Sequence, residues 1–171
     1  PSAFALFLDL DLDFYESHGI MPAVTKIFAL KRGTIMPEPL LKMDQVQAAM
    51  KAMMEKAMET PNEPVAMAIV DATGNLEAYA KMDNLRIFSR RHALRKAYTS
   101  AVMGLDSGVN GQRLHSQGRS ISEMGDPQLT HGQGGLVIMK DGVILGGIGV
   151  GGYPSGQSDE DLSRLGLEAM K

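Results

Sequence analysis

The 171-residue sequence contains no cysteine and no tryptophan, and aromatic residues make up only 5% of it. Without cysteine, the chain has no disulfide, thiolate metal site, cysteine nucleophile or c-type haem attachment. No apolar run approaches the ~18 residues that a membrane-spanning helix needs. The first residues lack a basic start and carry aspartates where the apolar region of a signal peptide would lie. We therefore expect a cytoplasmic protein that contacts no membrane.

An excess of positive charge is also missing. The formal net charge is −3, so a nucleic-acid partner is not expected. Hydrophobic residues make up 44% of the chain, which is enough for one globular core at this length. The thirteen methionines favour adaptable packing, either in that core or between subunits.

The sequence divides into an N-terminal extension or arm, residues 1–35, and a domain over residues 36–171. Within the extension, leucines and Phe14 alternate with aspartates over positions 8–14, which predicts a half-buried strand. The aspartates resemble the start of a calcium loop, but Phe14 replaces the required glycine, and we expect no calcium site. Met36 is an alternative start, which leaves open whether the extension is native.

The domain alternates helical and hairpin patterns. The predicted order begins with a helix over 43–59, a hairpin over 65–82 and a helix over 87–103. A polar segment over 106–134 with a short helix at 109–117 follows, then a second hairpin turning at 140–142, and a last helix with Ser158 as its N-cap. Hairpins pair antiparallel strands, so the expected fold class is α+β, with a central antiparallel sheet packed by helices.

The second hairpin contains a literal G-x-G-x-x-G motif at Gly147, Gly149 and Gly152. A dinucleotide-binding motif needs a following helix and a further βα unit, and the chain leaves no room for that unit before Lys171. The Asp-Gly between two apolar runs indicates a hairpin instead. Glycines inside a strand mark the close approach of a ligand or another backbone.

The polar segment collects the residues suited to acid–base chemistry. His131, Glu123 and His115 are candidate catalytic groups, and Arg113 and Arg119 are candidate clamps for a carboxylate substrate. His131 directly precedes a glycine and the next strand, so the scaffold should fix its position best. The alternative is a solvated loop whose charges pair with one another, and the sequence leaves both open.

The helix over 87–103 carries a basic side. This side consists of Arg86, Arg90, Arg91, Arg95 and Lys96. It suits haem propionates, phosphates or an organic acid, but such a charge run is also typical of a solvated helix face, and His92 reads as a surface imidazole there. No closely spaced histidine pair indicates zinc, and no G-x-S-x-G elbow indicates a serine nucleophile.

Three blocks resemble a known family. "AMAIVDATGNLEAYAKMD", "ALRKAYTSAVMG" and "GGLVIMKDGVILGGIGVGG", followed by an acidic helix, are similar in order and spacing to the GlcG/HbpS-like family, which includes the C-terminal domain of PduO-type proteins. The resemblance implies a profilin-like α/β/α sandwich around a five-stranded antiparallel sheet. It also implies assembly into dimers or larger homo-oligomers, and some members bind haem.

The resemblance also implies site residues. In the family, the glycine-rich strand and the Lys-Ala-Tyr-Thr segment border the ligand-facing or subunit-facing region. The matching ligand-binding candidates are Lys96, Tyr98, Gly147, Gly149 and Gly151. PduO-like members ligate haem through a histidine of the first helix, but the helix over 43–59 has none. A haem axial ligand would then be His131 or His115.

Two functions with a small ligand or substrate stay open at this point, beside a structural oligomer that binds no small ligand. The first is a homo-oligomeric protein that binds haem or a similar small anionic ligand. The second is an enzyme without a cofactor, of the isomerase, lyase or hydratase type, acting on a small carboxylate. In that enzyme His131 or Glu123 would transfer the proton and an arginine would hold the substrate. The sequence does not decide whether the protein is an enzyme.

Overall fold

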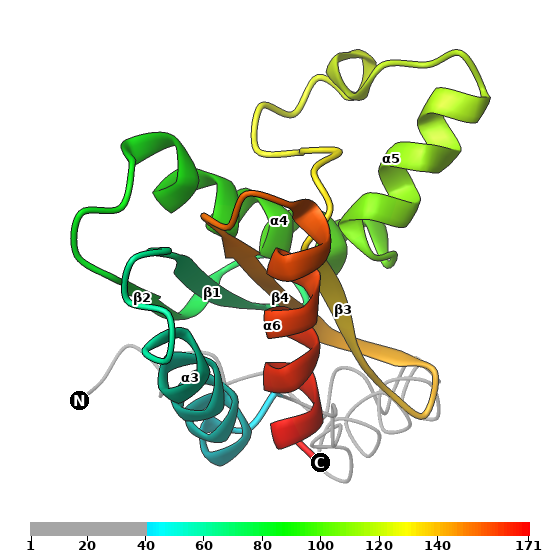
Figure 1. Cartoon of the computed structure of the whole chain (residues 1–171). Helices are drawn as coiled ribbons and strands as arrows, with labels where there is room; N and C mark the ends of the chain where they lie inside the picture. Colours follow the sequence, from blue (N-terminus) through cyan, green and yellow to red (C-terminus); the bar gives the residue numbers. More distant parts are fainter. Residues whose placement is uncertain (1–40) are drawn as a thin grey trace, which may run out of the picture. The chain divides into compact units, whose positions relative to one another are not determined.

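A computed structural model describes residues 41–171 (Figure 1). The N-terminal extension, with its expected strand, lies outside the described residues. The elements in chain order are α3 (Met43–Ala57), β1 (Ala66–Asp71), β2 (Leu76–Lys81), α4 (Ile87–Met103), α5 (Ser107–Ser116), the 3₁₀ helix η1 (Ile121–Met124), β3 (Gly135–Lys140), β4 (Val143–Gly151) and α6 (Gly156–Ala169). Within this part of the chain, no helix has both the length and the apolar character needed to cross a membrane.

The sheet is antiparallel, and its strand order is β2-β1-β4-β3. The two predicted hairpins, β1–β2 and β3–β4, are therefore joined side by side through β1 and β4. This confirms the α+β class. The expectation of five strands is wrong for residues 41–171, which form four. The polar segment between α4 and β3 forms α5, η1 and coil, so only the two hairpins supply strands.

Both hairpin turns have the chemistry that their sequences predict. Asp141 and Gly142 connect β3 to β4 with φ values of 51° and 79°, and positive φ at both positions suits a tight Asp-Gly turn. In the first turn, Asp71 Oδ1 accepts hydrogen bonds from the backbone N–H of Thr73 at 2.8 Å and of Asn75 at 2.9 Å. The carboxylate thus replaces backbone pairing that the turn cannot provide.

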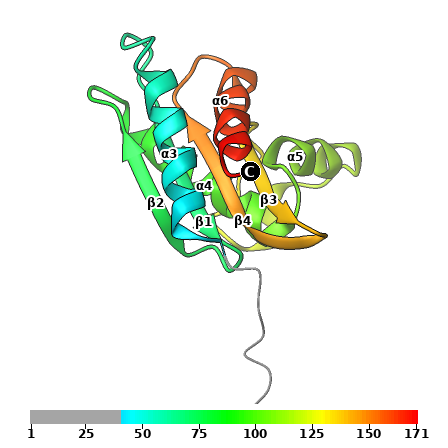
Figure 2. The same ribbon diagram turned by 90° about the horizontal axis from the view of Figure 1, so that it is seen from below.

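Helices cover both faces of the sheet (Figure 2). Helix α4 packs on one face, and α3 and α6 lie side by side on the other. Helix α3 buries residues spaced three or four apart, Val46, Ala49, Met50, Met53 and Ala57. These side chains join Ile69 of β1 and Ile148 of β4 in the main core. The observed architecture is therefore an α/β/α sandwich, as the family resemblance implies.

The glycines of β4 allow α4 to lie directly on the sheet. A side chain at Gly147 would collide with the carbonyl oxygen of Ala97, and one at Gly149 with the backbone N–H of Ala97. A side chain at Gly151 would approach the carbonyl oxygen of Ser89 at 2.9 Å. Of the two explanations for these glycines, close approach of another backbone is the one that the structure shows. Their role as ligand contacts stays a prediction.

Helix α6 begins earlier than the sequence suggests. Its N-cap is Ser155, whose Oγ accepts a hydrogen bond from the backbone N–H of Ser158 at 3.1 Å. The prediction of Ser158 as the cap is wrong, because Gly156 and Gln157 join the first turn. As a result Asp159 lies inside that turn, where its side chain is buried.

Candidate functional site

A pocket of about 400 Å³ lies beside the first half of α4. Phe88, His92 and Lys96 line it from α4, where their spacing of four residues places them on one side of the helix. The opposite walls come from Gly132 and Gln133, which precede β3, and from the connection between β4 and α6. The pocket therefore unites three segments that are far apart in the sequence.

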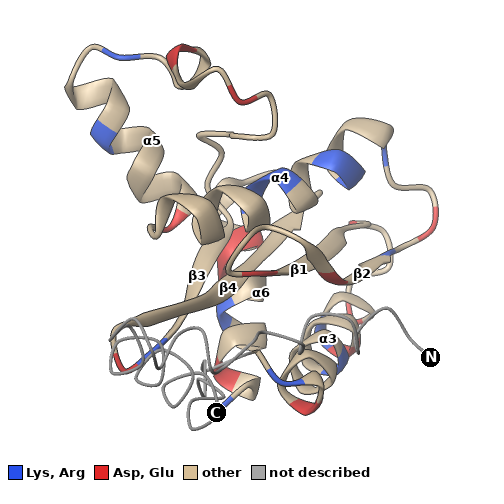
Figure 3. Cartoon of the chain, turned by 180° about the vertical axis from the view of Figure 1, so that it is seen from behind, with Lys and Arg blue, Asp and Glu red and all other residues tan. Residues whose placement is uncertain are grey.

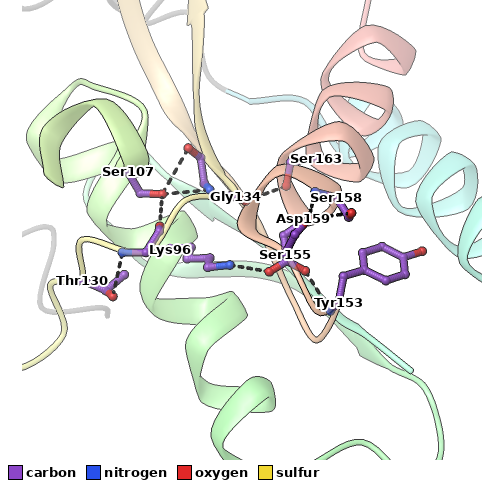
Figure 4. Close-up of polar contacts among 11 residues, drawn as sticks. Lys96, Ser107, Thr130, Gly134, Tyr153, Ser155, Ser158, Asp159 and Ser163 are labelled. Carbon is purple, nitrogen blue, oxygen red and sulfur yellow. Dashed lines mark hydrogen bonds and ion pairs between the residues drawn. The ribbon is translucent and has the colours of Figure 1, made fainter. Parts of the chain in front are cut away.

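A buried ion pair forms the floor of the pocket (Figure 4). Lys96 Nζ lies 2.6 Å from Asp159 Oδ2, and the two side chains are only 3% and 6% exposed. The other oxygen of Asp159 accepts a hydrogen bond from the backbone N–H of Tyr153 at 3.1 Å. Burial lowers the pKa of Lys96 and raises the pKa of Asp159, while attraction between the charges opposes both shifts. Lys96 is therefore not on a solvated helix face.

The backbone around the pair leaves no room for further side chains. Gly134 has φ of +116°, and a side chain there would come within 2.6 Å of Asp159 Cβ and 2.9 Å of Lys96 Nζ. Its carbonyl oxygen accepts a hydrogen bond from Ser163 Oγ of α6 at 2.8 Å. Gly134 thus allows α4 and α6 to meet through their charged side chains.

His92 lies in the wall of the pocket, and its description as a surface imidazole is wrong. The side chain is half-buried, and its Nδ1 is buried without a hydrogen-bond partner among residues 41–171. Its Nε2 lies against Gly132, and its ring stacks on Phe88 with the centroids 4.9 Å apart. Burial, and then the positive charges of Lys96 and Arg95, lower the pKa of His92 to about 4. The imidazole is consequently neutral at pH 7.

His131 adjoins the pocket, whereas His115 and Arg113 belong to α5. His131 is exposed, precedes the pocket residue Gly132 and lies against Gly111 of α5. Arg113 donates a hydrogen bond to Asn110 Oδ1 at 2.9 Å, and His115 is exposed on the last turn of the helix. The structure therefore brings only His131 of these three next to the pocket wall.

The remaining predicted residues have partners of their own. Arg119 Nε lies 3.3 Å from Glu123 Oε2 at the exposed helix η1, and the Ser120 N–H and Arg119 lower the pKa of Glu123. The hydroxyl of Tyr98 donates to Asp126 Oδ2 at 2.8 Å. Among the predicted site residues, all of which the structure describes, only Lys96 lines the pocket. Their functional roles stay predictions.

The sequence pattern did not indicate Phe88, His92 or Asp159 as residues of this pocket, and it indicated Arg86 only as part of the basic side of the helix. The spacing of Phe88, His92 and Lys96 was a usable signal, because residues four apart share one side of a helix. Asp159 had no such signal. Its partner is 63 residues away in the chain, and only the packing of α6 near α4 brings the charges together.

The pocket and the fold can now be compared with known proteins. A family described as "Haem degrading protein HbpS-like" matches residues 41–168. The chain belongs to the HbpS-like family.

Two curated relatives are corrinoid adenosyltransferases PduO. The protein from Citrobacter freundii is 26% identical over 180 residues, covering 98% of this chain and 50% of the relative. The protein from Salmonella typhimurium is 27% identical over 131 residues, covering 70% and 36%. The HbpS-like chain thus spans half or less of these relatives.

Solved structures show the same fold. A double mutant of HbpS from Streptomyces reticuli has a TM-score of 0.67 at 29% identity, covering 75% of this chain and 86% of that one. The structure described as a PduOC:heme complex has a TM-score of 0.68 at 23% identity, covering 76% and 94%. The Klebsiella pneumoniae protein ORFY has a TM-score of 0.67 at 23% identity, covering 75% and 89%. These likenesses support the HbpS-like fold.

The donor set of this HbpS-like chain fits haem. Helix α3 contains no histidine, and the described residues include His92, His115 and His131. His92 Nδ1 is buried and has no hydrogen-bond partner in the described part of the chain, and the neutral ring is in the protonation state that a metal ligand needs. His131 presents an exposed imidazole beside the pocket. Arg86 is a cation of the kind that pairs with a propionate, whereas Lys96 is already paired with Asp159.

Proposed function

We propose that this HbpS-like protein is a homo-oligomer that binds a small anionic ligand in the pocket beside α4. The observation that supports the proposal most is the composition of that pocket. Arg86 and Lys96 supply positive charge, His92 supplies a neutral imidazole, and Asp159 is already held by Lys96. Burying a charged lysine and aspartate is costly, and a ligand site is one setting in which such groups are kept.

Haem is the candidate ligand that the relatives suggest. A solved relative at 23% identity is described as a heme complex. His131, His115 and His92 are the histidines available as axial ligands, and His131 is favoured because it is exposed and adjoins the pocket. Arg86 would hold a propionate, since Lys96 is already paired with Asp159. Bound haem would supply a redox-active iron whose axial ligand sets its potential.

A haem titration of the purified protein, followed by absorbance, tests this proposal. We expect a saturable Soret shift at one haem per subunit or per dimer. The variant His131→Ala should change the position of that band, and His115→Ala is the matched variant outside the pocket. Unchanged spectra for both variants would remove these two ligands and leave His92→Ala as the next test. The absence of any saturable shift would refute haem binding.

The expected self-association has its own measurement. Sedimentation velocity over a hundredfold range of protein concentration should give a mass of two or more subunits at every concentration. A single species with the mass of one 18.4 kDa chain would refute the oligomer. Repeating the run with saturating haem then shows whether ligand and assembly are coupled.

The enzyme suggested by the sequence ranks second. Its acid–base candidate Glu123 is paired with Arg119 at an exposed helix, and neither residue lines the pocket. A turnover screen with small organic acids in metal-free buffer remains the direct test. Turnover that is lost in the double variant His131→Ala, Glu123→Ala would favour the enzyme over the binding protein.

A further inference from the structure

Two side chains at the start of α4 line the pocket and are directed to solvent. Phe88 is 67% exposed, although phenylalanine is usually buried. Its ring stacks on His92 with an angle of 24° between the planes, so the edges of the two stacked rings form an aromatic wall of the pocket. Arg86 also lines the pocket, and it enters none of the ion pairs formed by residues 41–171. Arg86, which has no carboxylate partner among residues 41–171, thus precedes the aromatic wall along the helix.

At the other end of the wall, Lys96 has N–H donors that can still form hydrogen bonds. An ammonium group has three N–H bonds, and within the described part of the chain Lys96 Nζ makes one hydrogen bond, to Asp159. The group is 3% exposed, so its other donors gain little from bulk water. An oxygen atom of a ligand in the pocket would satisfy them. Because Asp159 already balances the charge of Lys96, this end favours a polar oxygen over a full second anion.

The start of α4 adds positive potential near Arg86. The helix has 17 residues, its N-cap makes no side-chain hydrogen bond, and its first turn contains no acidic residue. Its dipole and free N–H groups therefore favour an anion at this end. Figure 3 shows basic residues along the first turns of α4. The anion-binding end and the Lys96 end lie ten residues apart on the helix, with the wall of Phe88 and His92 between them.

We infer that the ligand of this pocket is a single-ring aromatic acid with a second oxygen opposite its carboxylate. Arg86 receives the carboxylate, the ligand ring lies against the edges of Phe88 and His92, and Lys96 donates to the opposite oxygen. The inference rests on the proposed function and specifies the chemical class of its ligand. The pocket volume of about 400 Å³ lies at the small end of ligand pockets, which are roughly 300–1,000 Å³. Arginine is suited to binding a carboxylate through two parallel hydrogen bonds.

The probe for this inference is 4-hydroxybenzoate, titrated calorimetrically into the full chain. Benzoate lacks the second oxygen and should bind roughly tenfold more weakly, because one hydrogen bond from a charged donor is lost. Arg86→Gln should weaken 4-hydroxybenzoate binding at least ~10-fold for the same reason. Phe88→Ala should weaken it by about 3- to 10-fold, which is the usual worth of an aromatic contact.

The same helix supplies matched controls. Ile87 is 69% exposed and Arg91 is exposed, and neither lines the pocket. We expect Ile87→Ala and Arg91→Gln to leave the affinity within about twofold, because surface changes away from a site have small effects. All four positions are at the surface, so the variants should fold. Equal losses in the pocket variants and the controls would overturn the inference, because they would indicate nonspecific attraction to a basic helix.

The haem titration separates the two proposals. If haem binds and 4-hydroxybenzoate does not, the aromatic-acid inference is wrong and the proposed function stands. If neither binds and neither raises the melting temperature, both are wrong. If 4-hydroxybenzoate binds with the expected pattern of variants, the inference stands, and competition with haem then tests whether both occupy one pocket.

Discussion

At the scale of single residues, the pair formed by Lys96 and Asp159 is the most consequential feature of the molecule. Each charge is buried, and each is tolerated only because the other lies 2.6 Å away. The sequence indicates both residues as charged members of helices, and helices usually direct charges to solvent. Burial of this pair could not be predicted, because it depends on how α4 and α6 are placed across the sheet. The burial of His92 could not be predicted from the sequence for the same reason.

Removing one member of the pair should be far more harmful than removing both. Lys96→Met leaves the Asp159 carboxylate buried without a counter-charge, and we expect a loss of about 3–5 kcal/mol in the free energy of unfolding. The double variant Lys96→Met, Asp159→Leu replaces the pair by apolar groups and should recover most of that loss. Urea denaturation of the three proteins measures both values. Additive losses in the double variant would contradict the coupling.

His92 should make the stability depend on pH below neutrality. The unfolded histidine titrates near 6.5 and the folded one near 4, so the unfolded chain binds more protons between these values. The stabilisation is complete above pH 6.5 and is lost as the pH falls towards 4. A shift of this size corresponds to about 3 kcal/mol, which solvent around the half-exposed ring reduces to ~1–2 kcal/mol.

Urea denaturation at pH 7 and at pH 4.5 measures this effect, with His92→Gln as the comparison. We expect the stability difference between the two pH values to be smaller by ~1–2 kcal/mol in the variant, since glutamine does not titrate. Carboxylates titrate in both proteins and cancel in the comparison. An NMR titration of the His92 ring locates its pKa directly, and a midpoint near 6.5 would refute the burial effect.

At the scale of elements, the helices and hairpins are determined by interactions between residues that are close in the chain, and the sequence predicts them well. The spacing in α3, the turn at Asp71 and the Asp-Gly between β3 and β4 each depend on neighbours in the chain. The end of α4 at Gly104, which has φ of 63°, is likewise determined by a residue within the helix's own stretch of sequence. The cap of α6 was misplaced because Ser155 and Ser158 are both good caps. Only the path of the chain from β4 selects between them.

The contact between α4 and β4 gives a prediction at this scale. Gly149→Ala places a carbon where the backbone of Ala97 lies, so α4 must move away from the sheet. We expect a loss of about 1–3 kcal/mol in the free energy of unfolding, as for other overpacked cores. Gly108→Ala is the control, because its new carbon meets mainly the Gln133 side chain. Thermal unfolding of both variants measures the difference, and equal stabilities would show that α4 is free to shift.

At the scale of the whole molecule, the sandwich follows from pairing two hairpins and covering both faces of their sheet with helices. The order of helices and hairpins predicts an α+β class. The order of the elements does not determine which helices cover which face, and the three-layer sandwich was predicted only from the family resemblance. The fifth strand that the resemblance implies is missing from residues 41–171. The pocket exists only at this scale, because the packing of the elements is what brings Lys96 of α4, Gly132 before β3 and Asp159 of α6 together.

The main core consists of side chains between Leu41 and Met170. A chain that begins at Met36 keeps all of them, and we expect it to fold and to bind ligand as the full chain does. Its melting temperature should lie within about 4 °C of the full chain, which for a domain of this size corresponds to less than ~1 kcal/mol. Calorimetry of the two chains at equal concentration measures this difference. A larger loss would show that residues 1–35 contribute buried contacts, and the domain would then begin earlier than its sequence pattern suggests.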